Sequence, residues 1–96
     1  GAPRTGGGRV TLVVSPSRDA AVALLTGLPD PGAGKAYQMW VIDGTEATSA
    51  GVLAAGETSA RWLLAGVRGA DAFGVTVEPA GGSGKPTLPV AVAVPL

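Results

Sequence analysis

The residues that could take part in chemistry are few in this chain of 96 amino acids. Histidine and cysteine are both absent, so the sequence lacks the commonest general base, the commonest metal ligand and any thiolate nucleophile. Ser83 and Lys85 form the only close serine–lysine pair. They lie in a segment rich in glycine and proline, which does not hold a nucleophile and a base in a reactive geometry. The sequence therefore predicts a protein that is not an enzyme.

The segment around Lys85 also imitates a phosphate-binding loop. Gly84 and Lys85 match the end of that motif, but Pro79 stands in place of its first glycine. Pro86 replaces the serine or threonine that binds magnesium, and no helix is expected to follow. Without a helix N-terminus the phosphate has no dipole to bind to, so we predict no nucleotide site.

The seven carboxylates are scattered along the chain, and Asp43 and Glu46 are the pair that could share a calcium ion in one loop. Calcium requires about six or more oxygen ligands, which is more than one such loop supplies. We therefore expect no metal ion and no cofactor. The net charge is zero, so there is no electrostatic case for nucleic acid or an anionic membrane surface as a partner.

The stretch that organises the rest of the chain is residues 37–43, which is closed by the turn residues Asp43 and Gly44. Aromatic and β-branched residues bounded by turns are typical of a strand. Both faces carry large apolar side chains, which predicts a central strand covered on both sides. The two faces consist of Tyr37, Met39 and Val41, and of Gln38, Trp40 and Ile42.

A second clear strand spans residues 73–79, where apolar and small or polar side chains alternate. This period indicates one buried face. Pro79 ends the strand because it cannot donate to a ladder, and Gly81 and Gly82 lie in the turn that follows. We expect Glu78, at the strand end, to accept hydrogen bonds from backbone amides rather than to act in chemistry.

Glycine and proline make up a quarter of the chain, whereas 46% of the residues are hydrophobic. These two facts agree if many short strands are joined by turns. The sequence predicts an all-β fold: a single antiparallel β-sandwich of about seven strands over residues 9–96, preceded by a flexible linker over residues 1–8. The expected strands lie near residues 9–14, 20–26, 37–43, 50–54, 60–65, 73–79 and 90–94.

The side chains on the apolar strand faces should form one core between two sheets. Trp40 and Trp62 could instead form a platform for a sugar or a peptide, but we expect core packing because both lie on apolar faces. The expected core is Val10, Leu12, Val14, Leu24, Trp40, Ile42, Trp62, Leu64, Val75 and Val77. The residues expected to define its structural motifs are Tyr37, Trp40, Trp62, Val75, Val77, Glu78, Pro79, Gly81 and Gly82.

Several of these segments, taken together and in this order, resemble the C-terminal extracytoplasmic domain of the anti-sigma-K factor family. The matching pieces cover most of the chain from Val10 onward, and the second and fourth are the most specific. They are Gly27-Leu28-Pro29, Tyr37-Gln38-Met39-Trp40-Val41-Ile42-Asp43, Ala50-Gly51-Val52, Gly74-Val75-Thr76-Val77-Glu78-Pro79-Ala80-Gly81-Gly82-Ser83 and Pro86-Thr87.

The resemblance implies a regulatory function in transcription and signal transduction. Members of the family are typically single-pass membrane proteins whose cytoplasmic domain holds a sigma factor inactive. Regulated proteolysis outside and then within the membrane, by membrane-associated proteases, releases the sigma factor. This chain lacks the cytoplasmic domain and the membrane helix, so the resemblance implies that it is the outer domain alone, with residues 1–8 as its tether.

An alternative stays open from the residues themselves. The chain could be a secreted immunoglobulin-like module that presents its loops to a peptide or a carbohydrate. The two hypotheses differ in what precedes residue 1 in the full gene, which is a membrane helix for the regulator and a cleaved signal peptide for the module.

Overall fold

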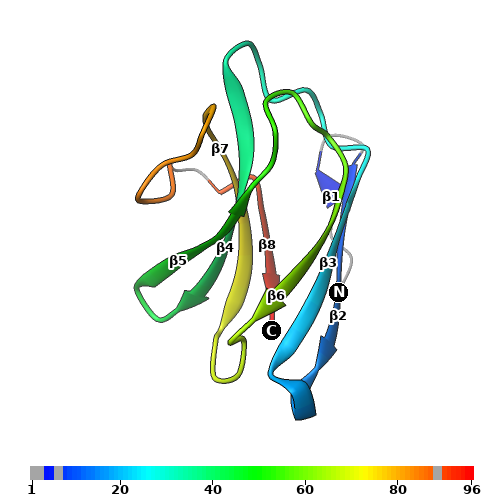
Figure 1. Cartoon of the computed structure of the whole chain (residues 1–96), viewed down its shortest axis with the longest axis vertical. Helices are drawn as coiled ribbons and strands as arrows, with labels where there is room; N and C mark the ends of the chain where they lie inside the picture. The colour runs from blue at the N-terminus through cyan, green and yellow to red at the C-terminus, as the bar shows by residue number, and fades with distance from the viewer. Residues whose placement is uncertain (1–3, 6–7, 88–89) are drawn as a thin grey trace.

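Two four-stranded antiparallel sheets face each other in the computed structural model, which describes residues 4–5, 8–87 and 90–96 (Figure 1). Sheet A has the strand order β1 (Arg4–Thr5), β2 (Gly8–Ser15), β3 (Ala20–Thr26) and β6 (Ala60–Ala65). Sheet B has the order β5 (Glu46–Val52), β4 (Lys35–Asp43), β7 (Ala72–Pro79) and β8 (Val92–Pro95). The predicted all-β antiparallel sandwich is confirmed. Each of the seven longer strands corresponds to a predicted one, and the two-residue β1 is an addition.

The stretch at residues 20–26 shows why the chain forms strands rather than helices. Its alanines and leucines also suit a helix, but burial alternates along it, with Ala21, Ala23 and Leu25 buried. A period of two is that of a strand with one face on the core. A single 3-10 turn, η1 (Pro16–Arg18), joins β2 to β3, and Asp19 completes the connection with a φ of 51°.

The hairpin between β4 and β5 differs from the prediction. Strand β5 begins at Glu46 rather than at residue 50, because Asp43 pairs directly with Glu46 across a tight turn at Gly44. The polar residues that follow the turn lie on an exposed edge strand, so they lack the apolar alternation by which strands are recognised. The register shifts between Met39 and Trp40, which places a bulge in β5.

The space between the sheets holds the hydrophobic core. Leu25 from sheet A and Met39, Phe73 and Val75 from sheet B are fully buried there. Loop residues close its ends, among them Leu28. The central position predicted for residues 37–43 follows directly, because β4 pairs with β5 on one side and with β7 on the other.

The predicted core needs correction at four positions. Val14 is 44% exposed. Leu24 alternates with the buried residues Ala23 and Leu25, so it faces outward from sheet A. Trp40 and Ile42 lie on the face of sheet B that is turned away from sheet A, because the neighbouring Met39 fills the inter-sheet core. Apolar alternation finds the two faces of a strand, but it cannot say which face meets the other sheet when both are buried.

The predicted linker falls partly outside the described residues, namely at residues 1–3 and 6–7. Within it, Arg4 pairs with Arg9 and Thr5 with Gly8, and Gly8 opens β2. The described part of the chain contains no helix that is long and apolar enough to span a membrane.

Candidate functional site: a buried polar network on the outer face of sheet B

Polar side chains are buried on the outer face of sheet B, the face turned away from sheet A. Gln38 on β4 and Thr76 and Glu78 on β7 are each almost inaccessible to solvent, as is Trp40, the next residue of β4 on the same face. Residues 80–87, which we call the strap, fold back over this face after β7 ends. Figure 1 shows the strap in orange, on the side of sheet B away from sheet A. Sheet B is therefore covered on both faces.

Gln38 fixes the first half of the strap through its side-chain amide. Its Nε2 donates to the carbonyl oxygen of Ser83 at 3.0 Å, and its Oε1 accepts from the Ser83 amide nitrogen at 2.8 Å. The same Nε2 also donates to the Ser49 hydroxyl at 2.9 Å. The glutamine amide thus pairs with the backbone of the strap much as a neighbouring strand would.

Glu78 fixes the second half of the strap. Its Oε2 accepts from the Thr87 amide at 2.7 Å and from the Thr76 hydroxyl at 2.5 Å, and its Oε1 accepts from the Thr87 hydroxyl at 2.6 Å. Thr76 in turn accepts from the indole nitrogen of Trp40 at 2.8 Å. A continuous chain of hydrogen bonds therefore runs from Trp40 through Thr76 and Glu78 to Thr87.

The network decides the charge of Glu78. Burial on its own would raise the pKa of this carboxyl, but hydrogen bonds from Thr76, from the hydroxyl and amide of Thr87 and from Ser83 favour the ionised form. Together they lower the pKa from 4.5 to about 2. Glu78 is thus a carboxylate at neutral pH whose partners are neutral donors. The sequence-based expectation that Glu78 accepts a backbone amide agrees with its bond from Thr87.

The glycines of the strap allow it to approach the sheet. Gly81 and Gly82 both have φ near +90°, a conformation that residues with a Cβ rarely adopt. A Cβ on Gly82 would lie 2.7 Å from Cγ2 of Val52 and 3.1 Å from Oε1 of Gln38. The amide of Gly82 also donates to the Pro79 carbonyl at 2.9 Å, which closes the turn after β7.

The other predicted motif residues lie on the sandwich side of the sheets. Val75 is fully buried in the core, and Val77 packs against it. Tyr37 is buried, and its hydroxyl donates to the Pro29 carbonyl at 2.6 Å; burial and the nearby Asp30 carboxylate raise the pKa of this hydroxyl. Trp62 is half-buried at the side of the sandwich and donates to the Ala50 carbonyl at 2.9 Å.

The structure thus divides the predicted motif residues into two groups. Trp40, Glu78, Pro79, Gly81 and Gly82 lie under, at the start of or within the strap, whereas Tyr37, Val75, Val77 and Trp62 support the sandwich. Sequence reasoning did not single out the partners that complete the network. These partners include Gln38 and Thr76. Two features of the sequence could have indicated them: Gln38 is a polar residue between apolar residues of a strand, and Thr76 lies two residues before Glu78 on the same strand face.

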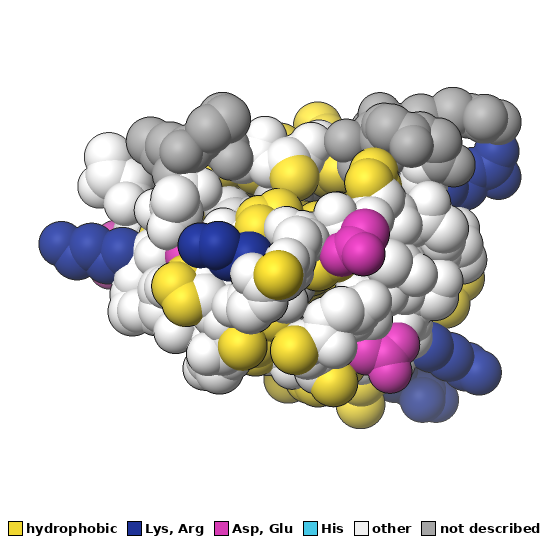
Figure 2. All heavy atoms as spheres, turned by 90° about the horizontal axis from the view of Figure 1, so that it is seen from above, with side chains coloured by type: hydrophobic (Ala, Val, Ile, Leu, Met, Phe, Trp, Pro, Cys, Tyr) yellow, Lys and Arg dark blue, Asp and Glu magenta, His cyan; other side chains and the backbone are white. Residues whose placement is uncertain are grey.

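This arrangement suits a structural role. Every buried side-chain nitrogen and oxygen in the described part of the chain has a hydrogen-bond partner. The described residues also contain no group of three or more side chains suited to hold a metal ion. Charges of both signs are dispersed over the end of the molecule seen from above (Figure 2).

Comparison with known proteins gives one family. Residues 1–91 match the family described as "Anti-sigma-K factor rskA, C-terminal". An anti-sigma-K factor RskA from Mycolicibacterium vanbaalenii is 38% identical over 93 residues, which cover 95% of this chain and 39% of that protein. The RskA of Mycobacterium ulcerans is also 38% identical, over 97% of this chain and 41% of that protein.

A further relative comes from Streptomyces griseus and is described as an uncharacterised protein in the phr 5′ region. It is 46% identical over 90 residues, which cover 92% of this chain and 38% of that protein. No solved structure matches the chain. The chain therefore spans about two fifths of the length of the curated relatives that it matches.

Proposed function

The chain belongs to the family of anti-sigma-K factor C-terminal domains, and from this premise we propose that it is the extracytoplasmic domain of a single-pass membrane anti-sigma factor. In this proposal the domain gates the regulated proteolysis that releases the sigma factor. The sigma factor binds a separate cytoplasmic domain of the full-length protein, and the proteases are membrane-associated. The relatives are about two and a half times as long as the matched region, which leaves room for such parts.

The observation that carries the gating proposal is the pairing of β1 with β2. We propose that residues 1–8 form the tether to the membrane and are the segment most open to cleavage, because terminal glycine-rich segments are preferred sites of proteolysis. Arg4 and Thr5 pair with Arg9 and Gly8 at the end of sheet A. A protease needs an extended substrate with free backbone groups, so this pairing shields the tether while the domain stays folded.

The position of Gly8 ties this pairing to the rest of the sandwich. A Cβ on Gly8 would lie 2.7 Å from the Cα of Leu28 and 2.8 Å from the carbonyl oxygen of Gly27. Leu28 is a buried core residue. Backbone therefore packs directly on backbone where the tether enters the sheet, so loss of the core fold would also free the tether.

This proposal is tested in the full-length protein with Gly8→Ala. The added methyl must push β2 from the 27–28 backbone, so we expect increased cleavage without an inducing signal, seen by immunoblot of the membrane fraction. Gly84→Ala is the matched control, because a Cβ there meets nothing within 4 Å. Hydrogen exchange at the backbone amides of residues 5 and 8 reports whether the pairing has opened, because residue 8 directs its backbone groups to β1 whereas Arg9 directs its own to Thr26 on β3. Opened pairing with cleavage at the control level would contradict the shielding of the tether.

A further inference from the structure

The four strands that end the two sheets differ in how they are protected from pairing with another chain. Exposed edge strands are commonly blunted by shortness, proline, charge or a bulge. Strand β1 has two residues, and β8 has four and ends at Pro95. Strand β5 carries a bulge opposite Met39 and Trp40. Each of these three ends has a feature that discourages strand addition.

Strand β6 is neither short nor interrupted by a proline or a bulge. It has six residues, Ala60–Ala65, with no proline, and its register with β3 is regular throughout. Arg61 is its only charged residue. Among the four strands that end the sheets, β6 is therefore the one that presents a long, regular and mostly apolar edge.

The direction of the free backbone groups on β6 follows from one bond at its end. The Gly66 amide donates to the Asp19 carbonyl at 2.9 Å, in line with the register that pairs Ala20 with Ala65 and Ala21 with Leu64. In an antiparallel pair, hydrogen-bonded residues alternate with residues that point their N–H and C=O away. The residues of β6 that direct these groups to the open edge are Arg61, Leu63 and Ala65.

The outer face of sheet A is apolar where it meets this edge. Leu63 is 71% exposed, and it is in register with Val22 on β3, which is in register with Val13 on β2. Val13 is itself 59% exposed. A row of three apolar side chains therefore crosses the sheet and ends at the open edge, where no strand of the described part of the chain follows β6.

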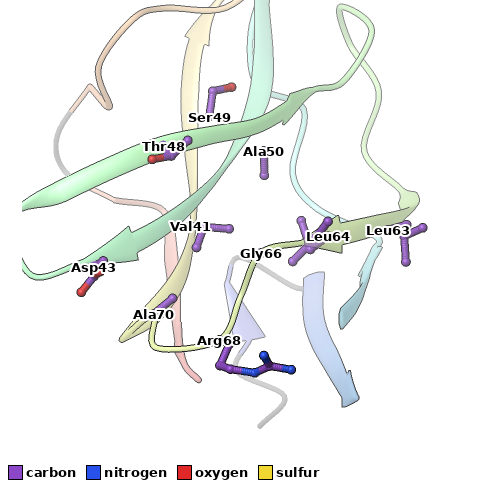
Figure 3. Close-up of a pocket in the computed structure, with 11 residues that line it drawn as sticks. Val41, Asp43, Thr48, Ser49, Ala50, Leu63, Leu64, Gly66, Arg68 and Ala70 are labelled. Carbon is purple, nitrogen blue, oxygen red and sulfur yellow. The ribbon is translucent and has the colours of Figure 1, made fainter. Parts of the chain in front are cut away.

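The inner side of the same edge opens into a groove of about 490 Å³ between β6 and the β4–β5 hairpin. Figure 3 shows Leu64 directed toward the side of Val41 and Ala50, whereas Leu63 points the other way. The indole of Trp62 bonds to the Ala50 carbonyl and joins the two strands at one end of the groove. An added strand would therefore have one face beside the exposed Leu63 and the other toward a groove lined by apolar residues such as Leu64 and polar residues such as Ser49.

We propose that the open edge of β6 binds an extended segment of a partner protein by strand addition. Such a segment pairs its backbone with Arg61, Leu63 and Ala65 and places alternate side chains in the groove and beside Leu63. Arg61 is exposed on the same face as Leu63, and Arg18 lines a hollow with Leu63 and Val13. Their positive charges favour a segment with an apolar centre and acidic ends.

The probe for this test is a blocked nonapeptide with valine at alternate positions, threonine between them and aspartate at each end. It is titrated into the isolated chain and followed by the backbone amide signals in NMR. We expect shifts and slowed hydrogen exchange at Arg61, Leu63 and Ala65, and no slowed exchange along β5 or β8. N-methylation of the peptide at one set of alternate residues should abolish binding, whereas methylation at the other set should not.

The protein variants separate backbone pairing from side-chain contact. Leu63→Pro removes an amide that faces the open edge and leaves the ladder with β3 intact, so we expect binding to weaken about tenfold or more at a nearly unchanged melting temperature. Leu63→Thr keeps the amide and should weaken binding only about threefold. If the proline variant unfolds, the N-methylated peptides still test backbone pairing, because they are titrated into the wild-type chain.

Four results would overturn the proposal. These are equal binding by wild type and Leu63→Pro, indifference to which peptide amides are methylated, shifts confined to another edge, and no shifts at millimolar peptide. Sedimentation of the chain without peptide tests whether a second copy of the chain binds the β6 edge. Dimers that are lost in Leu63→Pro would show that β6 pairs with a second copy instead of a partner segment.

Discussion

The indole nitrogen of Trp40 lies 2.8 Å from the hydroxyl oxygen of Thr76, on the face of sheet B that is turned away from sheet A. The largest fully buried side chain among the described residues is thus part of a polar network rather than of the inter-sheet core. Through Thr76 this tryptophan is connected to Glu78 and then to the strap. The stability of the sheet and the closure of the strap are therefore coupled.

The first prediction concerns the hydrogen bond of Trp40. Trp40→Phe keeps most of the aromatic area but leaves the Thr76 hydroxyl without its donor, so the free energy of unfolding should fall by about 1–2 kcal/mol. Trp40→Ala should cost about 3–5 kcal/mol, because it also empties a buried site. Urea unfolding measures both. Lys35→Ala, at an exposed position of the same strand, is the control and should change stability little.

The second prediction concerns the charge of Glu78. The folded chain lowers the pKa of Glu78 from its ordinary value of 4.5 to about 2. The carboxylate therefore stabilises the fold above about pH 4.5. That contribution is lost as the pH falls toward 2 and amounts to about 3 kcal/mol. Glu78→Gln should be less stable than wild type at pH 7, and the difference should shrink between pH 4.5 and 2.

The control for this pH dependence is Glu57→Gln, which changes an exposed carboxylate. Unfolding free energies of the three proteins are compared from pH 7 to pH 2. A difference between wild type and Glu78→Gln that stays constant over this range would show that Glu78 is not held as a carboxylate by its donors.

The third prediction concerns the strap. Gly82→Ala places a methyl group against Val52 and Gln38 at a φ of 92°, so we expect a loss of about 1–3 kcal/mol and faster hydrogen exchange at Ser83 and Thr87. Gly84→Ala lies two residues further along the same segment, where an added Cβ meets nothing within 4 Å. If the two variants exchange at the same rate, the close approach of Gly82 does not hold the strap.

Sequence patterns were sufficient for most of the strands and their antiparallel pairing, because those strands alternate or are apolar and are bounded by turn residues. They missed the polar first half of β5, which lies on an exposed edge. They were insufficient where both faces of a strand are buried. Trp40 and Met39 have equally apolar neighbours in the sequence, and only the pairing of β4 with β7 and the return of the strap show which of them meets sheet A. The same limit hid the network, because Gln38 and Ser83 are 45 residues apart.

The motif pieces that resemble the family do meet in space, which the sequence order did not require. Tyr37 bonds to Pro29, and Gln38 bonds to Ser83. Glu78 bonds to Thr87. Each contact joins one matching segment to another, so these short motifs have a physical reason to occur together: they complete the same sheet and the segment that covers it.

The central claim is that the folded state of this domain gates release of the sigma factor. The most direct measurement compares Trp40→Ala with Lys35→Ala in the full-length protein, using a transcriptional reporter for the sigma factor without an inducing signal. The expected loss of about 3–5 kcal/mol raises the unfolded fraction by two to four decades, at about 1.4 kcal/mol per decade. We predict raised output for Trp40→Ala and basal output for Lys35→Ala. A Trp40→Ala domain that is destabilised in vitro while the reporter stays at the Lys35→Ala level would contradict the claim.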